Sequence, residues 1–139
     1  MRTVLTIGTF DVPHLGHAYL LRQCEGLGDT VLVGVNSDEF VEQYKGARPA
    51  FAYRERMELI SAMGYEVRYN DGPGRDLILR VRPAVLAIGM DWLEKDYTAQ
   101  INMTVRELSQ SGIVLAYVPT MAATELEKLS ATRIKDRLR

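Results

Sequence analysis

The chain has 139 residues, 47% of them hydrophobic, and a formal net charge of −1 from 17 Lys and Arg against 18 Asp and Glu. This size predicts one domain over residues 1–139, and the balanced charge excludes the global basic signature of binding to nucleic acid or an anionic membrane. The single Cys24 excludes an intramolecular disulfide framework, and its apolar neighbours predict a buried thiol. Without a leader-like or membrane-spanning apolar run, we expect a cytoplasmic protein with no membrane partner.

Short segments rich in Val, Ile and Leu alternate along the chain with amphipathic segments. In chain order, the pattern predicts a strand at 3–7, a helix at 17–27, strand 30–35, helix 53–63, a weaker strand 66–69, helix 75–81, strand 84–88, helix 99–111 and strand 113–118. Gly28 and Gly112 follow two of the helices and predict left-handed caps. The alternation predicts an α/β fold, a single Rossmann-like, doubly wound parallel sheet with helices on both faces, whose ligand crevice lies beyond the carboxyl ends of the strands.

The segment 44–52 lies between two helical patterns and carries Lys45 and Arg48 together with Gly46 and Pro49. This composition predicts a mobile basic loop over the crevice. An ordinary solvated connection is the alternative, and the segment alone does not decide between the two.

The first predicted strand ends close to Gly8, and the chain continues TFDVPHLGH before helical periodicity begins. Glycines at 8 and 16 allow a ligand to approach the main chain, and a helix N-terminus favours an anion. His14 and His17 are three residues apart, so their imidazoles face the same side. Two converging donors suit phosphoryl or nucleotidyl transfer, in which catalysis is chiefly positioning and electrostatic stabilisation. Surface or capping histidines are the alternative.

Other sites for cofactors lack their signatures. With one Cys and two His in the chain, a zinc site would lack ligands, and we predict no metal held by a protein cluster. The dinucleotide pattern GxGxxG and the P-loop pattern GxxxxGK[ST] are both absent.

GTFDVPHLGH resembles the GTFDxxHxGH signature of the cytidylyltransferase-like nucleotidyltransferases, the HxGH superfamily, and looks most like glycerol-3-phosphate cytidylyltransferases. VGVNSDEFVEQYKG resembles that family's second strand and lysine loop, and RERMELI resembles the arginine-bearing helix that follows. IGMDW resembles the family's GDDW segment, and LSATRIKDRL resembles its ISTTxI helix start. The pieces occur in family order across nearly the whole chain.

The resemblance implies a role for each matching residue. His14 and His17 would stabilise the transition state at the α-phosphate, Lys45 would neutralise phosphate charge, and Arg56 would hold the phosphate of the accepting substrate. Within this set, Asp11 would orient its loop, Asp91 and Trp92 would border the nucleotide, and the hydroxyls of Ser130 and Thr132 would bind the outer phosphates. The implied nucleotide-binding residues are Gly8, Thr9, Phe10, Asp11, Gly16, Asp91, Trp92, Ser130, Thr132 and Arg133.

Structural explanations compete with some of these roles. Arg56 could be an exposed helix charge, Asp91 could cap a turn, Trp92 could be a core or lid aromatic, and Ser130 could be a helix N-cap.

The match fails in two places. The arginine of the family's RTEGIS stretch is missing, so Lys128 or Arg133 could supply its charge, and Met90 replaces an acidic residue of GDDW. KGARP and ERMELISAM also resemble adenylyltransferase domains that make ADP-activated sugars.

The resemblance implies an enzyme that transfers CMP from CTP to a small phosphorylated substrate such as glycerol 3-phosphate and releases pyrophosphate. An adenylyltransferase that uses ATP on a sugar phosphate is the enzymatic alternative, and a catalytically reduced nucleotide sensor is the alternative of another class. We expect Mg²⁺ bound mainly through the nucleotide, a homodimer, and no nucleic-acid partner.

Overall fold

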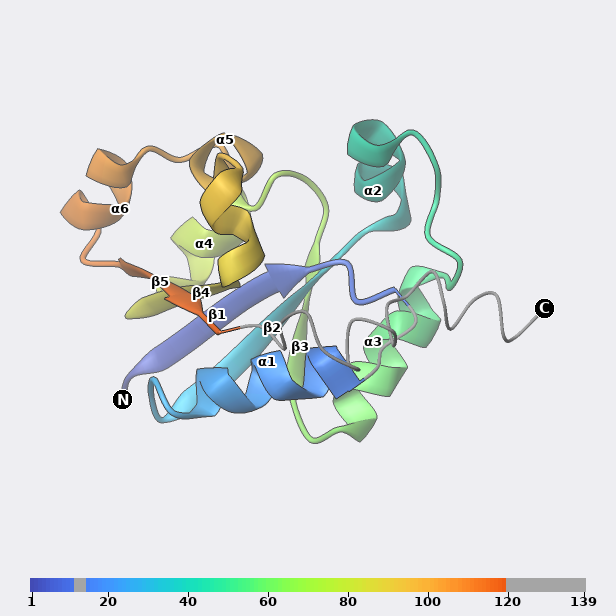
Figure 1. The fold of residues 1–139 in the computed structure, drawn as a ribbon, viewed down its shortest axis with the longest axis horizontal. Helices are drawn as coiled ribbons and strands as arrows, with labels where there is room; N and C mark the ends of the chain where they lie inside the picture. The colour runs from blue at the N-terminus through green and yellow to red at the C-terminus, as the bar shows by residue number, and fades with distance from the viewer. Residues whose placement is uncertain (12–14, 120–139) are drawn as a thin grey trace.

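The computed structural model describes residues 1–11 and 15–119. Its centre is a sheet of five parallel strands in the order β3-β2-β1-β4-β5 (Figure 1). The strands are β1 (Thr3–Gly8), β2 (Thr30–Asn36), β3 (Glu66–Asn70), β4 (Val85–Gly89) and β5 (Val114–Val118). The described helices are α1 (Leu15–Glu25), α2 (Asp38–Lys45), α3 (Tyr53–Ala62), α4 (Arg75–Val81), α5 (Tyr97–Ile101) and α6 (Val105–Gln110), with a 3₁₀ helix η1 (Met90–Glu94). The predicted α/β fold with a parallel sheet is confirmed.

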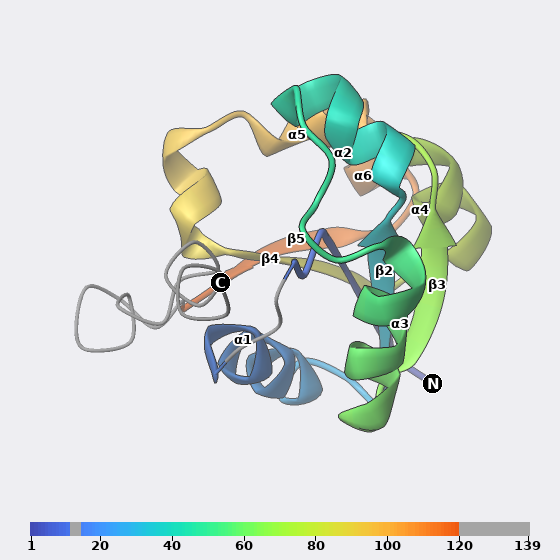
Figure 2. The same cartoon turned by 90° about the vertical axis from the view of Figure 1, so that its right-hand side faces the viewer.

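Helices cover both faces of the sheet (Figures 1 and 2). Because successive side chains of a strand point to opposite faces, neighbouring residues of β1 enter different cores. Val4 packs with Cys24 of α1, whereas Leu5 packs in the cluster formed with Ile78 of α4 and Ile101 of α5. The central strands are therefore buried on both faces, which explains their unbroken apolar sequences.

The strand order places a topological switch at β1. The chain runs from β1 outward to β2 and β3, and then returns to pair β4 with the other side of β1. In open α/β sheets, ligands bind at the carboxyl ends of the strands where the order reverses. The predicted crevice is therefore expected beyond Gly8, at the end of β1.

The helix predicted over 99–111 is wrong as a single element. Asn102 adopts a left-handed conformation, with φ of 56°, that ends α5, and a capping box between Thr104 and Glu107 starts α6. The apolar periodicity continues across this break, because Ile101 and Leu108 are both buried in the same cluster. Periodicity alone could not separate the two helices.

One other local detail differs from the prediction, and two agree with it. Gly28 does not have the predicted left-handed conformation; instead, a Cβ there would lie 2.7 Å from the carbonyl oxygen of Arg2, so close packing requires glycine. Gly112 is left-handed as predicted, with φ of 73°. Cys24 is fully buried, also as predicted, and burial raises the pKa of its thiol to about 12. None of the helices in the described part of the chain has the length and apolar character needed to cross a bilayer.

Candidate active site

A cavity of about 480 Å³ opens at the carboxyl ends of β1 and β2, between α2 on one side and the η1–α5 segment on the other. It lies at the topological switch, and its size is within the range of small-molecule sites. It is lined by Ile7, Gly8, Thr9, Phe10, Asp11, His17, Asn36, Phe40, Tyr44, Lys45, Pro73, Asp91, Trp92, Lys95, Tyr97, Gln100 and Ile101.

The turn after β1 is built around Phe10. This residue has a positive φ of 52°, which is uncommon for a side chain other than glycine and marks a constrained backbone. The ring covers Gly8, where a Cβ would lie only 2.9 Å from Cε2 of Phe10. Its other contact is an edge-to-face arrangement with the imidazole of His17, at 5.3 Å between ring centroids. Phe10 is 4% exposed, so its main contribution is to pack the turn and support His17.

His17 lies in the first turn of α1, half-buried, and lines the cavity. Gly16 precedes it in the same turn, where the main chain of a helix start favours an anion. His14, the second predicted catalytic histidine, lies outside the described residues. The same is true of Ser130, Thr132 and Arg133, and of Lys128, so their predicted roles stay predictions.

Lys45 reaches the cavity from the last turn of α2, on the side opposite η1. Its Nζ atom lies 5.6 Å from the centroid of the neighbouring Tyr44 ring, which is a favourable position for a cation. The hydroxyl of Tyr44 is 2.9 Å from Oγ1 of Thr9, so α2 is tied to the end of β1 next to Lys45.

The segment after Lys45 is held by specific contacts, and so differs from the predicted mobile basic loop. Arg48 makes ion pairs back to three carboxylates of α2, at 4.0 Å to Asp38, 3.6 Å to Glu39 and 3.4 Å to Glu42. These acidic partners compensate its charge. Of the predicted loop 44–52, only Tyr44 and Lys45 line the cavity, and both belong to the last turn of α2.

Asp11 joins this segment to the turn that precedes α1. Its Oδ2 accepts a hydrogen bond of 2.9 Å from the backbone N–H of Ala50, and its Oδ1 accepts one of 3.0 Å from Phe51. Both carboxylate oxygens therefore hold the backbone of the 46–52 connection. Asp11 also lines the cavity. This geometry is compatible with the predicted orienting role, in which Asp11 fixes the main chain beside the histidines.

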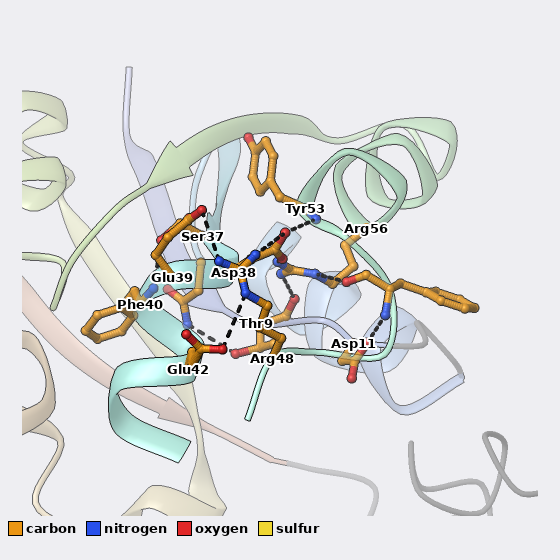
Figure 3. A network of polar contacts seen from close by, with 12 residues as sticks. Thr9, Asp11, Ser37, Asp38, Glu39, Phe40, Glu42, Arg48, Tyr53 and Arg56 are labelled. Atoms are coloured by element: carbon orange, nitrogen blue, oxygen red, sulfur yellow. Dashed lines mark hydrogen bonds and ion pairs between the residues drawn. The ribbon is translucent and has the colours of Figure 1, made fainter. Parts of the chain in front are cut away.

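The side chain of Arg56 has no exposed surface and does not line the cavity. Figure 3 shows its polar contacts. Its three nitrogens already donate: Nη1 to the carbonyl of Thr9 at 2.6 Å, Nη2 to Oδ1 of Asp38 at 2.7 Å, and Nε to the carbonyl of Phe51 at 2.9 Å. The burial of Arg56 excludes the alternative of an exposed helix charge. Its role at the phosphate of the accepting substrate stays a prediction. In this arrangement Arg56 is a positioning residue.

Asp38 connects the same elements from the other side (Figure 3). Besides pairing with Arg56, it accepts a hydrogen bond of 3.3 Å from the backbone N–H of Tyr53 at the start of α3. Asp38 is the first residue of α2, whose N-cap Ser37 accepts from the N–H of Phe40. One carboxylate therefore fixes the starts of two helices relative to each other.

The opposite wall of the cavity comes from the residues after β4. Asp91 is exposed and lines the cavity, and Trp92 lines it as well. The indole also packs edge-to-face on Tyr97 at 5.2 Å, so the core and cavity explanations of Trp92 both hold. Lys95 places its Nζ 5.2 Å from the indole centroid. Met90 is 43% exposed and does not line the cavity, so its departure from the family pattern falls outside this wall.

Nine of the residues that line the cavity were not identified from the sequence, and Asn36, Tyr44 and Lys95 are among them. Asn36 directly follows the predicted strand 30–35, and polar residues at that position of a parallel strand reach the crevice. That signal could have identified Asn36. Lys95 had no comparable signal, because its position depends on the 3₁₀ turn of η1, which apolar periodicity does not reveal.

Within the described residues no group of three or more His, Cys, Asp or Glu side chains could hold a metal ion. Two carboxylates line the cavity, and both oxygens of Asp11 already accept backbone hydrogen bonds. Asp91 is the other carboxylate. A Mg²⁺ ion commonly uses one or two carboxylates together with substrate phosphates, and this wall fits such an arrangement.

Comparison with known proteins identifies a family. The family model described as cytidylyltransferase-like matches residues 5–137. The chain is 35% identical over 99 residues to the "Bifunctional protein HldE" of Helicobacter pylori (strain Shi470), and 36% identical over 99 residues to that of Campylobacter concisus (strain 13826). Each of these alignments covers 68% of this chain and 21% of the relative, so the chain spans about a fifth of the length of these proteins.

A solved structure shares the fold. The lipopolysaccharide core biosynthesis protein from Thermoplasma volcanium GSS1 is 26% identical, with a TM-score of 0.65 over 88% of this chain and 98% of that chain.

Proposed function

The chain belongs to the cytidylyltransferase-like nucleotidyltransferases, and we propose that it transfers AMP from ATP to a sugar phosphate and releases pyrophosphate. One observation carries the proposal. A single cavity at the topological switch is lined by His17 and Lys45 on its phosphate side and by Asp91 and Trp92 on its other wall. An imidazole and an ammonium beside a carboxylate and an indole suit the binding of a nucleoside triphosphate and the stabilisation of charge at its α-phosphate.

The chemistry is a substitution at the α-phosphorus. An oxygen of the acceptor phosphate forms a new bond to this phosphorus, and the bond to the bridging oxygen of the β-phosphate breaks. That oxygen leaves with the electron pair as part of pyrophosphate. Negative charge increases on the α-phosphate oxygens in the transition state, so preorganised donors such as the imidazoles of His17 and His14 lower the barrier.

The other residues supply binding and electrostatics. The ammonium of Lys45 offsets phosphate charge from the α2 side, and the start of α1 adds main-chain N–H groups beside His17. Phe10 keeps the His17 ring in place through the contact at 5.3 Å. Because the acceptor oxygen attacks the α-phosphorus directly, no covalent enzyme intermediate is needed.

We propose that Mg²⁺ binds chiefly through the triphosphate, with Asp91 the carboxylate that reaches it. When bound, the ion supplies positive charge that offsets the developing charge of the pyrophosphate leaving group. Asp91 would hold this ion at the wall opposite Lys45.

The choice of ATP and of a sugar phosphate rests on similarity. KGARP and ERMELISAM resemble adenylyltransferase domains that make ADP-activated sugars, and the solved structural relative is named for lipopolysaccharide core biosynthesis. The second candidate is CMP transfer from CTP to glycerol 3-phosphate. It is favoured by the likeness of GTFDVPHLGH to the signature of glycerol-3-phosphate cytidylyltransferases.

Pyrophosphate release tests the proposal. The purified chain is assayed with ATP or CTP and Mg²⁺ against hexose 1-phosphates, a heptose 1-phosphate and glycerol 3-phosphate. Turnover with ATP and a sugar phosphate is the expected result, whereas turnover with CTP and glycerol 3-phosphate selects the second candidate. Binding of either triphosphate without release under every condition would mean a sensor. We also expect a homodimer, which a molar mass measured by light scattering during size-exclusion chromatography would check.

A further inference from the structure

Two asparagines face each other at the ends of adjacent strands. Asn36 is the last residue of β2 and Asn70 the last residue of β3, and they are register partners in the parallel pairing. Both are buried, with 5% and 3% of their surface exposed. Buried amides are kept where they have partners or a function, since an unpaired buried polar group costs free energy.

The surrounding hydrogen bonds determine which way both amides face. The carbonyl oxygen of Gly72 can only accept, and it takes a hydrogen bond of 2.9 Å from Nδ2 of Asn70. The same nitrogen lies 2.8 Å from Asn36, so the atom of Asn36 on that side must be its acceptor, Oδ1. The amide nitrogen of Asn36 therefore lies on the side of Thr9, to whose Oγ1 it donates at 3.2 Å.

This orientation leaves a donor at the cavity. An amide nitrogen carries two hydrogens, and Thr9 is the only described acceptor of Nδ2 of Asn36. Asn36 and Thr9 both line the cavity. A ligand oxygen that reached this nitrogen would complete its hydrogen bonding, and the orientation of the donor is already fixed before the ligand arrives.

Asn36 lies on the opposite side of β1 from Asp91 and Trp92, the two residues expected to border the nucleotide. Asp91 and Trp92 follow β4 on one side of β1, whereas Asn36 follows β2 on the other side. Its neighbours in the cavity wall include Phe40 and Tyr44 of α2, whose rings are 4.9 Å apart at their centroids. Aromatic faces next to an oriented amide donor suit a compact ligand that carries both C–H surface and hydroxyl groups.

We propose that the amide N–H of Asn36 donates to a hydroxyl oxygen of the phosphorylated acceptor and selects a polyhydroxylated acceptor, with Asn70 holding the amide in its donating orientation. This inference rests on the proposed nucleotidyl transfer and assigns the acceptor half of the same cavity. Asn36 is then a specificity-determining residue, and Asn70 is a positioning residue that does not line this cavity.

The test compares acceptors that differ by one hydroxyl. Steady-state rates are measured with hexose 1-phosphates and glycerol 3-phosphate, and with their monodeoxy counterparts. Asn36→Leu removes the donor without adding charge, and Gln43→Leu makes the same change at an exposed residue of α2 outside the cavity. We expect Asn36→Leu to lower kcat/KM about tenfold for the hydroxylated acceptor, because the donor to one hydroxyl is lost. For the deoxy acceptor that lacks this hydroxyl, the decrease should be less than twofold. The KM of the triphosphate should be unchanged. Gln43→Leu should leave all of these values as in the wild type.

A second variant separates loss of the donor from loss of folding. In Asn36→Asp the side chain still accepts from Nδ2 of Asn70, but it presents an acceptor in place of the donor. Its acceptor selectivity should fall as in Asn36→Leu. The inference is overturned if both variants lower kcat/KM equally for hydroxylated and deoxy acceptors, or if neither changes it. If the wild-type chain releases pyrophosphate without any acceptor, the proposed transfer to an acceptor is wrong, and the role of Asn36 in acceptor selection is wrong as well.

Discussion

Nη1 of Arg56 donates to the carbonyl oxygen of Thr9 over 2.6 Å, and this bond connects α3 to the turn that leads from β1 to α1. The same guanidinium holds Asp38 at the start of α2. A fully buried charge with three hydrogen-bonded partners is stable only while all of them remain, because a buried ion without its partner keeps its desolvation cost. The active-site turn and the α2 helix therefore share one anchor.

We expect Arg56→Ala to lower the free energy of unfolding by about 3–5 kcal/mol, since it removes the nearest cation of Asp38, takes the hydrogen-bond donor from the carbonyls of Thr9 and Phe51, and opens a cavity. Urea denaturation followed by circular dichroism measures this change. Arg54→Ala is the matched control, because Arg54 is exposed on the same helix, and its loss should cost less than about 0.5 kcal/mol. Equal effects of the two substitutions would contradict the anchoring role.

Burial determines which elements of the fold could be predicted from the sequence. The apolar strands 3–7 and 30–35 were predictable, because strands covered on both faces must be apolar throughout. Helix α2 was not predicted with its bounds, since it has only eight residues and buries only Val41, although Ser37 and Gly46 are in the positions of its caps. The sequence could not show that Arg56 is buried, because its partners Thr9 and Asp38 are distant from it in the chain.

The candidate site was predictable to the extent that its residues follow strands in local motifs. His17, Lys45 and Asp91 all line the cavity, and each was named from a contiguous motif. Asn36 and Lys95 also line the cavity, but they lie at the end of β2 and directly after η1, where their neighbours come from other elements. The position of Asn36 directly after the predicted strand 30–35 could have identified it, whereas the 3₁₀ turn that positions Lys95 left no comparable signal in the sequence.

His17 should be the described residue whose removal affects turnover most strongly. Its imidazole lines the cavity and is held against Phe10, so we expect His17→Ala to lower kcat about 10²–10³-fold, as the loss of one oxyanion donor does elsewhere. Pyrophosphate release under saturating triphosphate and acceptor measures kcat. Arg22→Ala, in the last turn of the same helix and away from the cavity, is the control and should retain wild-type turnover. A decrease of less than tenfold for His17→Ala would contradict direct stabilisation of the transition state.

Lys95 is expected to attract the triphosphate. Its ammonium stands over Trp92 at the cavity wall that carries Asp91, and the family's RTEGIS arginine is missing from this chain. Lys95→Ala should therefore raise the KM of the triphosphate about fivefold to tenfold with little change in the KM of the acceptor. Arg106→Ala removes the same charge from an exposed site outside the cavity and should change neither. An unchanged triphosphate KM in Lys95→Ala would exclude this contact.

Acid stability should depend on the ion pair between Arg75 of α4 and Glu107 of α6. The hydrogen bond from Arg75 lowers the pKa of Glu107 to about 2, with a further contribution from the N–H of Thr104. A carboxyl whose pKa is lower in the folded state stabilises the protein above its unfolded pKa of about 4.3 and loses that contribution as the pH falls toward 2. Glu107→Gln keeps an oxygen that can accept from Thr104 but removes the charge.

We therefore expect Glu107→Gln to unfold at a lower urea concentration than the wild type at pH 7. The difference between the two midpoints should shrink from about pH 5 downward and vanish only below the folded-state pKa of about 2, where the wild-type carboxyl is protonated as well. Glu58→Gln removes an exposed carboxylate of α3 and should give a difference close to zero at each pH. Because Arg75 and Glu107 are both partly exposed, 0.5 M salt should also reduce the difference at pH 7. A difference for Glu107→Gln that stayed constant from pH 7 to pH 2 would show that its side chain contributes through packing or capping instead of through its charge.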